Sequence, residues 1–200
     1  MTLLDDRPSA SSSGARRAMI DSQLRVSGVN EPAVLAAFAA VAREDFVPAE
    51  LRSSAYIDRA VALGDGSFLP APLVHGRMLS EALPTAGQRV LVVSANGYLA
   101  ALVAAMGAEP VTLTPAEAAA TRKAGEPAGL IFVDGAIEQL PAGLAARLAE
   151  GGRIVTGVVE RGVTRLAFGR KTAGEVALLP LAELGIPVLA AFAAPKRWSF

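Results

Sequence analysis

The pattern of apolar and polar positions changes at about residue 88. From there to residue 159, short apolar runs alternate with stretches of helical spacing. Such runs, bounded by helices, are typical of parallel strands that are buried on both faces of a sheet. The pattern therefore predicts a doubly wound α/β core, with strands and helices in the order 89–93, 98–106, 110–113, 115–124, 130–133, 141–149 and 153–159.

The residues before this core predict helices. We expect residues 1–14, which include a serine-rich run, to form a flexible tail that ends at a helix N-cap near Ser13. Pro32 opens a second helix, and Pro72–Leu83 is predicted to form another. The segment 46–66 has broken apolar spacing, which indicates a short helix followed by irregular, partly extended chain.

The last forty residues predict short strands at 163–168, 176–179 and 188–192. A turn as short as Gly169–Lys171 favours antiparallel pairing, because a parallel crossover needs about a dozen residues or more. We therefore expect one mostly parallel α/β sheet with antiparallel strands at its C-terminal edge and helices at the N-terminus.

Composition and charge exclude several function classes. Hydrophobic residues make up 52% of the chain and charged residues 19%, which predicts a globular protein. Nineteen basic residues balance nineteen acidic ones, so neither a nucleic acid nor a membrane surface is an expected partner. The N-terminus lacks the pattern of a secretory signal, and no apolar stretch reaches the roughly 18 to 20 residues of a membrane span. We expect a cytoplasmic protein.

The residues also exclude thiol and metal chemistry. The chain has no cysteine and one histidine, His75, so no metal site is expected. We interpret His75 as a surface or helix-packing residue. Trp198 is interpreted as an aromatic residue that closes the core, with a partner anchor as the alternative.

Several segments together resemble one enzyme family. In order along the chain they are Met19–Leu24, Arg43–Pro48, Ala55–Asp58, Leu63–Gly66, Ile131–Glu138 and Leu148–Val155. Their order and spacing are similar to those of the protein-L-isoaspartate O-methyltransferases. This family of class I methyltransferases uses S-adenosylmethionine and has a Rossmann-like fold. The resemblance implies a single methyltransferase-like domain over 15–200, with a helical and substrate-loop part at 15–85 and a core at 86–200.

The resemblance also implies a reaction and its partners. Family members move a methyl group from S-adenosylmethionine to the isoaspartyl carboxylate of a damaged protein, which is a repair reaction. The cofactor would border Val92–Tyr98 at the end of the first core strand. Where the family has an acid in that strand this chain has Val92, and of the family's three turn glycines only Gly97 remains, behind Ser94 and Asn96. Each added Cβ crowds the cofactor, so weak binding is expected.

Two further cofactor positions follow from the resemblance. The acid that holds both ribose hydroxyls is replaced by Thr114, and Glu117 in the next turn is the alternative residue for this contact. Asp134 ends the next strand and is the best remaining candidate for a catalytic or cofactor-binding side chain. The alternative role of Asp134 is to cap the following helix.

The predicted substrate loop differs from the family in a similar way. At the family's serine position stands Pro70, within the sequence Phe68–Pro72. Its side chain offers no donor or acceptor to orient a carboxylate, so the serine's catalytic contribution is lost at this position. Two hypotheses therefore remain for this chain: an enzyme with impaired activity on isoaspartyl proteins, or an inactive methyltransferase-like module, a pseudoenzyme, that binds an unknown protein.

Overall fold

The computed structural model of the chain describes residues 10–120 and 125–194. Trp198 lies outside these residues. The helices are α1 (Ala10–Met19), α2 (Pro32–Ala40), α3 (Pro72–Ala82), α4 (Tyr98–Ala105), α5 (Pro115–Ala120) and α6 (Ala142–Arg147), and the short helical turns are η1 (Ile20–Leu24), η2 (Arg25–Ser27), η3 (Arg43–Phe46), η4 (Ala49–Ser54) and η5 (Ala190–Phe192). None of the helices in the described part of the chain is long and apolar enough to span a bilayer.

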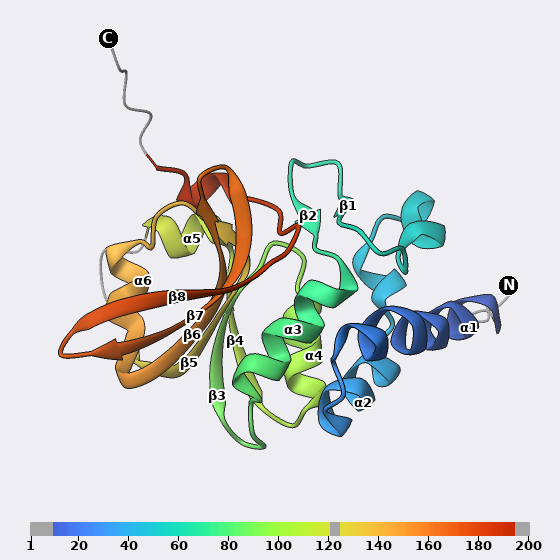
Figure 1. The fold of residues 1–200 in the computed structure, drawn as a ribbon, viewed down its shortest axis with the longest axis horizontal. Helices are drawn as coiled ribbons and strands as arrows, with labels where there is room; N and C mark the ends of the chain where they lie inside the picture. The colour runs from blue at the N-terminus through green and yellow to red at the C-terminus, as the bar shows by residue number, and fades with distance from the viewer. Residues whose placement is uncertain (1–9, 121–124, 195–200) are drawn as a thin grey trace, which may run out of the picture.

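A six-stranded sheet forms the centre of the molecule (Figure 1). Its strands, in spatial order, are β4 (Glu109–Leu113), β3 (Arg89–Val93), β5 (Ala128–Ile137), β6 (Leu148–Glu160), β7 (Val163–Thr172) and β8 (Glu175–Glu183). The first four are parallel, and β7 and β8 are antiparallel to their neighbours. The predicted mostly parallel sheet with an antiparallel C-terminal edge is confirmed.

The central strands β3 and β5 are buried on both faces, as their continuous apolar runs predict, whereas β4, at the edge of the sheet, is largely exposed. Along β3, Val90 and Val92 belong to one hydrophobic cluster, which also contains residues of α2, α3 and α4, whereas Leu91 and Val93 belong to a second cluster with Ala118 and Leu144. Figure 1 shows α1 to α4 on one side of the sheet and α5 and α6 on the other. Side chains that alternate along β3 and β5 therefore belong to two separate cores.

A two-stranded hairpin precedes α3. Its strands β1 (Val61–Ala62) and β2 (Phe68–Leu69) are antiparallel, and Gly64 and Gly66 lie in the turn between them with φ angles of 92° and 85°. Residues with a side chain rarely adopt such positive angles, so these glycines fix the shape of the turn. The hairpin brings its turn over the carboxyl ends of the parallel strands, where the site described below lies.

The N-terminal part differs from the expectation at one point. Helix α1 begins by Ala10, so Ser13 lies inside the helix and is not its N-cap. The helix is held to the following segment by Arg16, which donates to the Tyr56 hydroxyl at 2.9 Å and pairs with Glu44 at 3.2 Å. The serine-rich run is therefore helical in this chain, and the contacts of Arg16 with Tyr56 and Glu44 hold the C-terminal half of the helix in place.

The C-terminal segment also differs from the expectation. The strand predicted at 188–192 is not formed: a single parallel bridge joins Val188 to Ala136, and the chain then turns into η5. Pro187 has no amide hydrogen to extend a ladder, but its carbonyl accepts from the Ala136 amide at 2.8 Å. Residues 186–192, which we call the C-terminal strap, therefore cross the end of β5 without joining the sheet.

Candidate functional site

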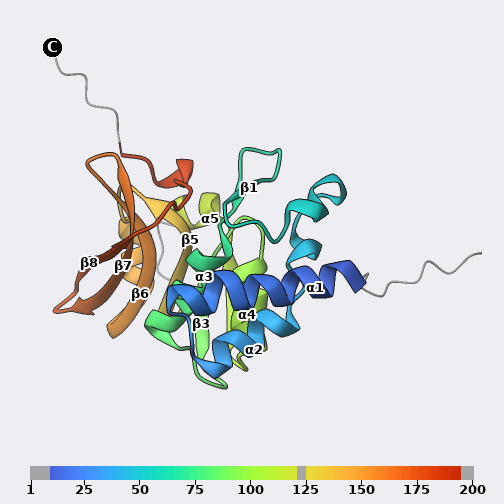
Figure 2. The ribbon, with the colours of Figure 1, turned by 45° about the vertical axis from the view of Figure 1, so that its right-hand side comes forward.

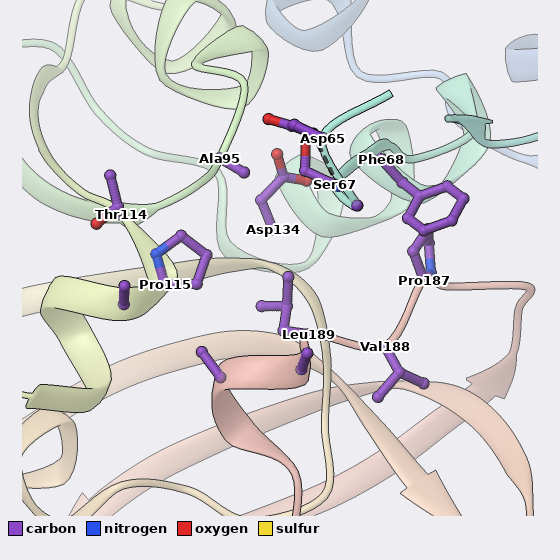
Figure 3. Close-up of a pocket in the computed structure, with 14 residues that line it drawn as sticks. Asp65, Ser67, Phe68, Ala95, Thr114, Pro115, Asp134, Pro187, Val188 and Leu189 are labelled. Atoms are coloured by element: carbon purple, nitrogen blue, oxygen red, sulfur yellow. Dashed lines mark hydrogen bonds between the residues drawn. The ribbon is translucent and has the colours of Figure 1, made fainter. Parts of the chain in front are cut away.

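A crevice opens at the carboxyl ends of β3, β4 and β5. Its cavity volume is about 380 Å³, in the range of small-molecule sites. One wall is the β1–β2 hairpin and another is the C-terminal strap (Figure 3). The lining residues are Asp65, Gly66, Ser67, Phe68, Ala95, Thr114, Pro115, Ala116, Asp134, Pro187, Val188, Leu189, Ala190 and Ala191. Ligands of open α/β sheets bind at this edge, so the crevice is the candidate site.

The Asp134 carboxylate lies at the base of the crevice and is only 3% exposed. Its Oδ1 is 2.7 Å from His75 Nε2, and its Oδ2 accepts from the Ser94 hydroxyl at 2.8 Å and from Asn96 Nδ2 at 3.3 Å. Both carboxylate oxygens are therefore bonded inside the protein. Asp134 does not cap a helix, because β5 continues to Ile137 and α6 begins only at Ala142; that interpretation was wrong.

A buried arginine stands behind the histidine. Arg43 is fully enclosed, with its guanidinium 5.0 Å from the centre of the Tyr98 ring. It donates from Nε to the Ala55 carbonyl at 2.6 Å and from Nη2 to the Pro70 carbonyl. Its Nη1 is 3.4 Å from His75 Nδ1, so Nδ1 accepts and Nε2 carries the proton that is donated to Asp134. The imidazole ring of His75 thus connects the positive charge of Arg43 to the negative charge of Asp134 by hydrogen bonds.

The network affects the acidity of Asp134. Burial alone raises the pKa of this carboxyl group, but the hydrogen bonds from His75, Ser94 and Asn96 and the field of His75 outweigh it, so its pKa lies below the ordinary value. Asp134 is therefore ionised at neutral pH. A carboxylate with a lowered pKa and two occupied oxygens is a weak proton acceptor, which argues against a role as general base.

We expect Asp134 to control stability in acid. A group whose pKa is lower in the folded state contributes stability above its unfolded pKa, about 3.9 for Asp, and that contribution is lost as the pH falls through the folded-state value. Asp134→Asn should therefore lose less stability than the unmodified protein below about pH 4. Urea unfolding between about pH 6 and pH 3 measures this, with the exposed Asp58→Asn as control. Equal slopes for all three proteins would show that the carboxylate is not held ionised.

The turn after β3 also satisfies its own polar groups. Gly97 directly precedes α4 and has a φ of 79°, a backbone conformation that favours glycine. The Ser94 hydroxyl accepts from the backbone amides of Asn96 at 3.3 Å and Gly97 at 3.2 Å, and Asn96 Oδ1 accepts from the Tyr98 amide at 2.9 Å. Three of the amides at this helix N-terminus, those of Asn96, Gly97 and Tyr98, are thus occupied and less available to a ligand.

Of the other predicted positions, only Thr114 lines the crevice, and none points a charge into it. Val92 is fully buried in the core. At the end of β4, the Thr114 amide and hydroxyl both donate to Glu117 Oε2 at 2.8 Å, and the Glu117 amide returns a bond of 3.2 Å to the hydroxyl, which is a capping box. Glu117 therefore turns back to Thr114 and is not one of the lining residues. Pro70 is buried, with its carbonyl bound to Arg43.

Sequence reasoning missed two members of this site. His75 is buried in α3, which agrees with the interpretation as a helix-packing residue and not with that as a surface residue. It also binds Asp134, which is 59 positions away in the sequence. Arg43 belongs to a segment that carries the family resemblance, yet no role was assigned to it. A histidine within an otherwise apolar helix face was the available signal for a buried polar partner. No group of three or more acidic, histidine or cysteine side chains that could hold a metal occurs in the described residues.

The sheet order, the antiparallel edge and the crevice at the carboxyl ends define an α/β domain of the methyltransferase type. Two solved structures share the fold. One, a putative protein-L-isoaspartate O-methyltransferase from Plasmodium falciparum in complex with S-adenosyl-L-homocysteine, has a TM-score of 0.70 at 17% identity, over 90% of this chain and 98% of that one. The other, a protein-L-isoaspartate O-methyltransferase, has a TM-score of 0.73 at 16% identity, over 89% and 67%.

Sequence comparison is more specific than the fold. The family model of protein-L-isoaspartate(D-aspartate) O-methyltransferase matches residues 15–121. Relatives with this enzyme name include one from Methylorubrum populi, 34% identical over 165 residues, which are 70% of this chain and 78% of the relative, and one from Koribacter versatilis, 33% identical over 186 residues, which are 80% and 84%. The chain belongs to the protein-L-isoaspartate O-methyltransferase family, and the resemblance in its motifs is confirmed.

Proposed function

We propose that this chain is a protein-L-isoaspartate O-methyltransferase family protein in which methyl transfer to isoaspartyl carboxylates is impaired, and which serves as a binding or structural module. Membership of the family implies S-adenosylmethionine as methyl donor and isoaspartyl-containing proteins as substrates. The observation that carries the proposal is that the polar groups around the crevice are bonded to one another. A ligand must break these bonds before it can use the same groups.

The residues at the crevice do not fit the family's way of holding the cofactor. The Asp134 oxygens are taken by His75, Ser94 and Asn96. The buried side chain of Val92 offers no charge to the amino group of the cofactor, and the hydroxyl of Thr114 is engaged by Glu117. A charge-assisted hydrogen bond is worth about 1.5 to 3 kcal/mol, so two lost anchors reduce affinity by about 3 kcal/mol or more. That figure corresponds to about a hundredfold in the dissociation constant.

The leucine of the strap is a further obstacle. A Cβ at Gly135 would lie 2.5 Å from Leu189 Cγ, so this side chain fills the space directly above the glycine beside Asp134. Leu189 also lines the crevice and points toward Pro115 in Figure 3. In this chain an apolar side chain thus occupies a position beside the surviving carboxylate, where a polar ligand group would need to be solvated or hydrogen-bonded.

The predicted substrate loop, of which only Phe68 lines the crevice, gives the same indication. The Pro70 carbonyl is used by Arg43, and the Pro70 ring is buried. Phe68 and Ala71, which flank the Leu69–Pro70 pair, carry no polar side-chain group. An isoaspartyl carboxylate held against these residues would lose its hydration without gaining a donor, which costs several kcal/mol. The chain therefore lacks the positioning on which an in-line methyl transfer depends.

Calorimetric titration with S-adenosyl-L-homocysteine tests the proposal. We expect binding at least about a hundredfold weaker than in a family member that keeps the acidic residue and the three turn glycines. Radiolabelled methyl transfer to an isoaspartyl peptide, at saturating donor, should not exceed the control without enzyme. Restoring Thr, Ser and Gln at positions 68, 70 and 71 should not rescue transfer by itself, because the Ser94–Gly97 turn is unchanged.

Two outcomes contradict the proposal. Micromolar binding of S-adenosyl-L-homocysteine would show that the internal hydrogen bonds open without a large cost. Methyl transfer at a rate that scales with protein concentration would establish the repair enzyme that the family relationship implies.

A further inference from the structure

The ionisable groups around the crevice all have the same sign. Among the described residues that line it, Asp65 and Asp134 are the charged ones, and none is basic. They come from different elements, the β1–β2 turn and strand β5, and Figure 3 shows both carboxylates on the same side of the cavity. Family substrates carry a carboxylate at the reacting group, and none of the described lining residues supplies a positive charge to receive it.

The two carboxylates differ in how their charges are matched. Asp134 is enclosed, and the His75–Arg43 pair behind it supplies a donor and a positive charge. Asp65 is exposed and forms no ion pair with the described part of the chain. Asp65 therefore carries the unmatched charge of the crevice.

Asp65 is nevertheless held in a fixed position. Its Oδ1 accepts from the Ser67 amide at 2.8 Å and from the Ser67 hydroxyl at 2.5 Å, which is the geometry of an Asx turn. These bonds keep the pKa of Asp65 below its ordinary value, so the side chain is ionised at neutral pH. Its other oxygen, Oδ2, accepts no hydrogen bond from the described residues and remains available to a ligand.

The rest of the crevice is mainly apolar. The ring of Phe68 is 42% exposed, and Figure 3 places it beside Pro187 of the strap. Pro115, Ala116 and Leu189 complete the apolar wall. An apolar wall and an exposed carboxylate in one crevice favour a cation with an apolar body, because the apolar part is buried against the wall and the carboxylate attracts the positive charge.

We propose that Asp65 is a specificity-determining residue that makes the crevice admit small organic cations with an apolar body and reject carboxylates. This inference rests on the proposed function, since an isoaspartyl carboxylate would have to approach Asp65 without a basic side chain to receive it. The positively charged group of such a ligand would lie at Asp65, and its apolar part would contact Phe68 and the strap.

A matched pair of probes tests this selectivity on the full chain. 2-Phenylethylammonium and 3-phenylpropionate share an aromatic ring and a similar length but have opposite charges. Ligand-observed NMR titration at low salt should detect binding of the ammonium probe and not of the propionate. Salt should weaken the binding of the ammonium probe, because the charge of Asp65 is exposed to solvent.

Two variants assign the effect to Asp65. Asp65→Asn keeps an oxygen that can accept both Ser67 hydrogen bonds and removes only the charge. It should weaken binding of the ammonium probe by about fivefold, the upper range for an exposed charge pair, and bring the affinities of the two probes together. Asp58→Asn makes the same change of net charge at an exposed residue that lines a different cavity, and should leave both affinities unchanged.

The outcomes separate this inference from the proposed function. Equal binding of the two probes to the unmodified protein, or an equal effect of the Asp65 and Asp58 variants, overturns the role of Asp65. No methyl donor or isoaspartyl peptide is present, so these results do not depend on catalysis. Tight binding of S-adenosyl-L-homocysteine together with selectivity for the ammonium probe would overturn the impaired-enzyme proposal and leave the role of Asp65 standing.

Discussion

Replacing Arg43 with methionine is expected to lower the free energy of unfolding by about 3 to 5 kcal/mol, the range measured when one partner of a buried charge pair is removed. Arg43 is fully buried, and its loss leaves the Asp134 charge without the cation that lies behind His75. The carbonyls of Ala55 and Pro70 would lose their donor as well. The loss therefore combines an unmatched charge with unsatisfied buried acceptors.

Urea unfolding of four variants measures this effect: Arg43→Met, Asp134→Asn, the double variant that combines them, and Arg17→Met as the control. Arg17→Met removes an arginine from an exposed position of α1 and should change stability by no more than about 0.5 kcal/mol. The double variant Arg43→Met with Asp134→Asn removes both charges, so it should be less destabilised than the sum of the single variants. An Arg43→Met protein as stable as Arg17→Met, or strictly additive effects in the double variant, would contradict the coupling through His75.

The sheet could be predicted from the sequence because its signal is local. Each apolar run of the core, such as 130–133, is bounded by helical spacing, and a strand with alternate side chains in two cores must be apolar throughout. The bounds were less accurate: β5 extends to Ile137, beyond the predicted run. Its extension pairs with β6 after a register shift between Phe132 and Ala136, which depends on tertiary contacts and not on local pattern.

The polar network could not be predicted because its members are distant in sequence. Asp134 was identified by its position at the end of a strand, but its partner His75 is 59 residues away and its second neighbour in the network, Arg43, is a further 32 from His75. Which helix face meets the strand end is decided by the packing of α3 on the sheet. A buried arginine is also rare, and the sequence around it offers no signal that distinguishes it from an exposed one.

The C-terminal strap shows where an apolar pattern is ambiguous. Residues 188–192 have the composition of a short strand, and Val188 does form one bridge to Ala136. The ladder ends there because the chain folds into η5, whose Phe192 is buried in the second core. Helix α5 packs beside η5. The apolar run 188–192 thus crosses the end of the sheet and does not extend it, and the sequence alone does not distinguish such a segment from a strand.

The strap leads to the second large expected effect, which concerns Gly135. A Cβ at this position would lie 2.5, 2.8 and 2.9 Å from Cγ, Cδ2 and Cδ1 of Leu189. Gly135→Ala should therefore displace the strap and destabilise the protein by about 1 to 3 kcal/mol, the usual cost of overpacking. Gly129→Ala, in the same strand, is the matched control, because its added Cβ meets nothing within 4 Å.

Hydrogen exchange and a double variant identify Leu189 as the cause of this loss. Gly135→Ala should increase exchange of the Leu189 amide, which donates to the Ala136 carbonyl at 2.9 Å, whereas Gly129→Ala should leave it protected. Leu189→Ala removes the clashing atoms, so Gly135→Ala should cost at least about 1 kcal/mol less in that background than in the unmodified protein. If the cost is the same in both backgrounds, the strap does not rest on Gly135. The reduced cost would instead show that the leucine occupies the space beside the Asp134 carboxylate in solution.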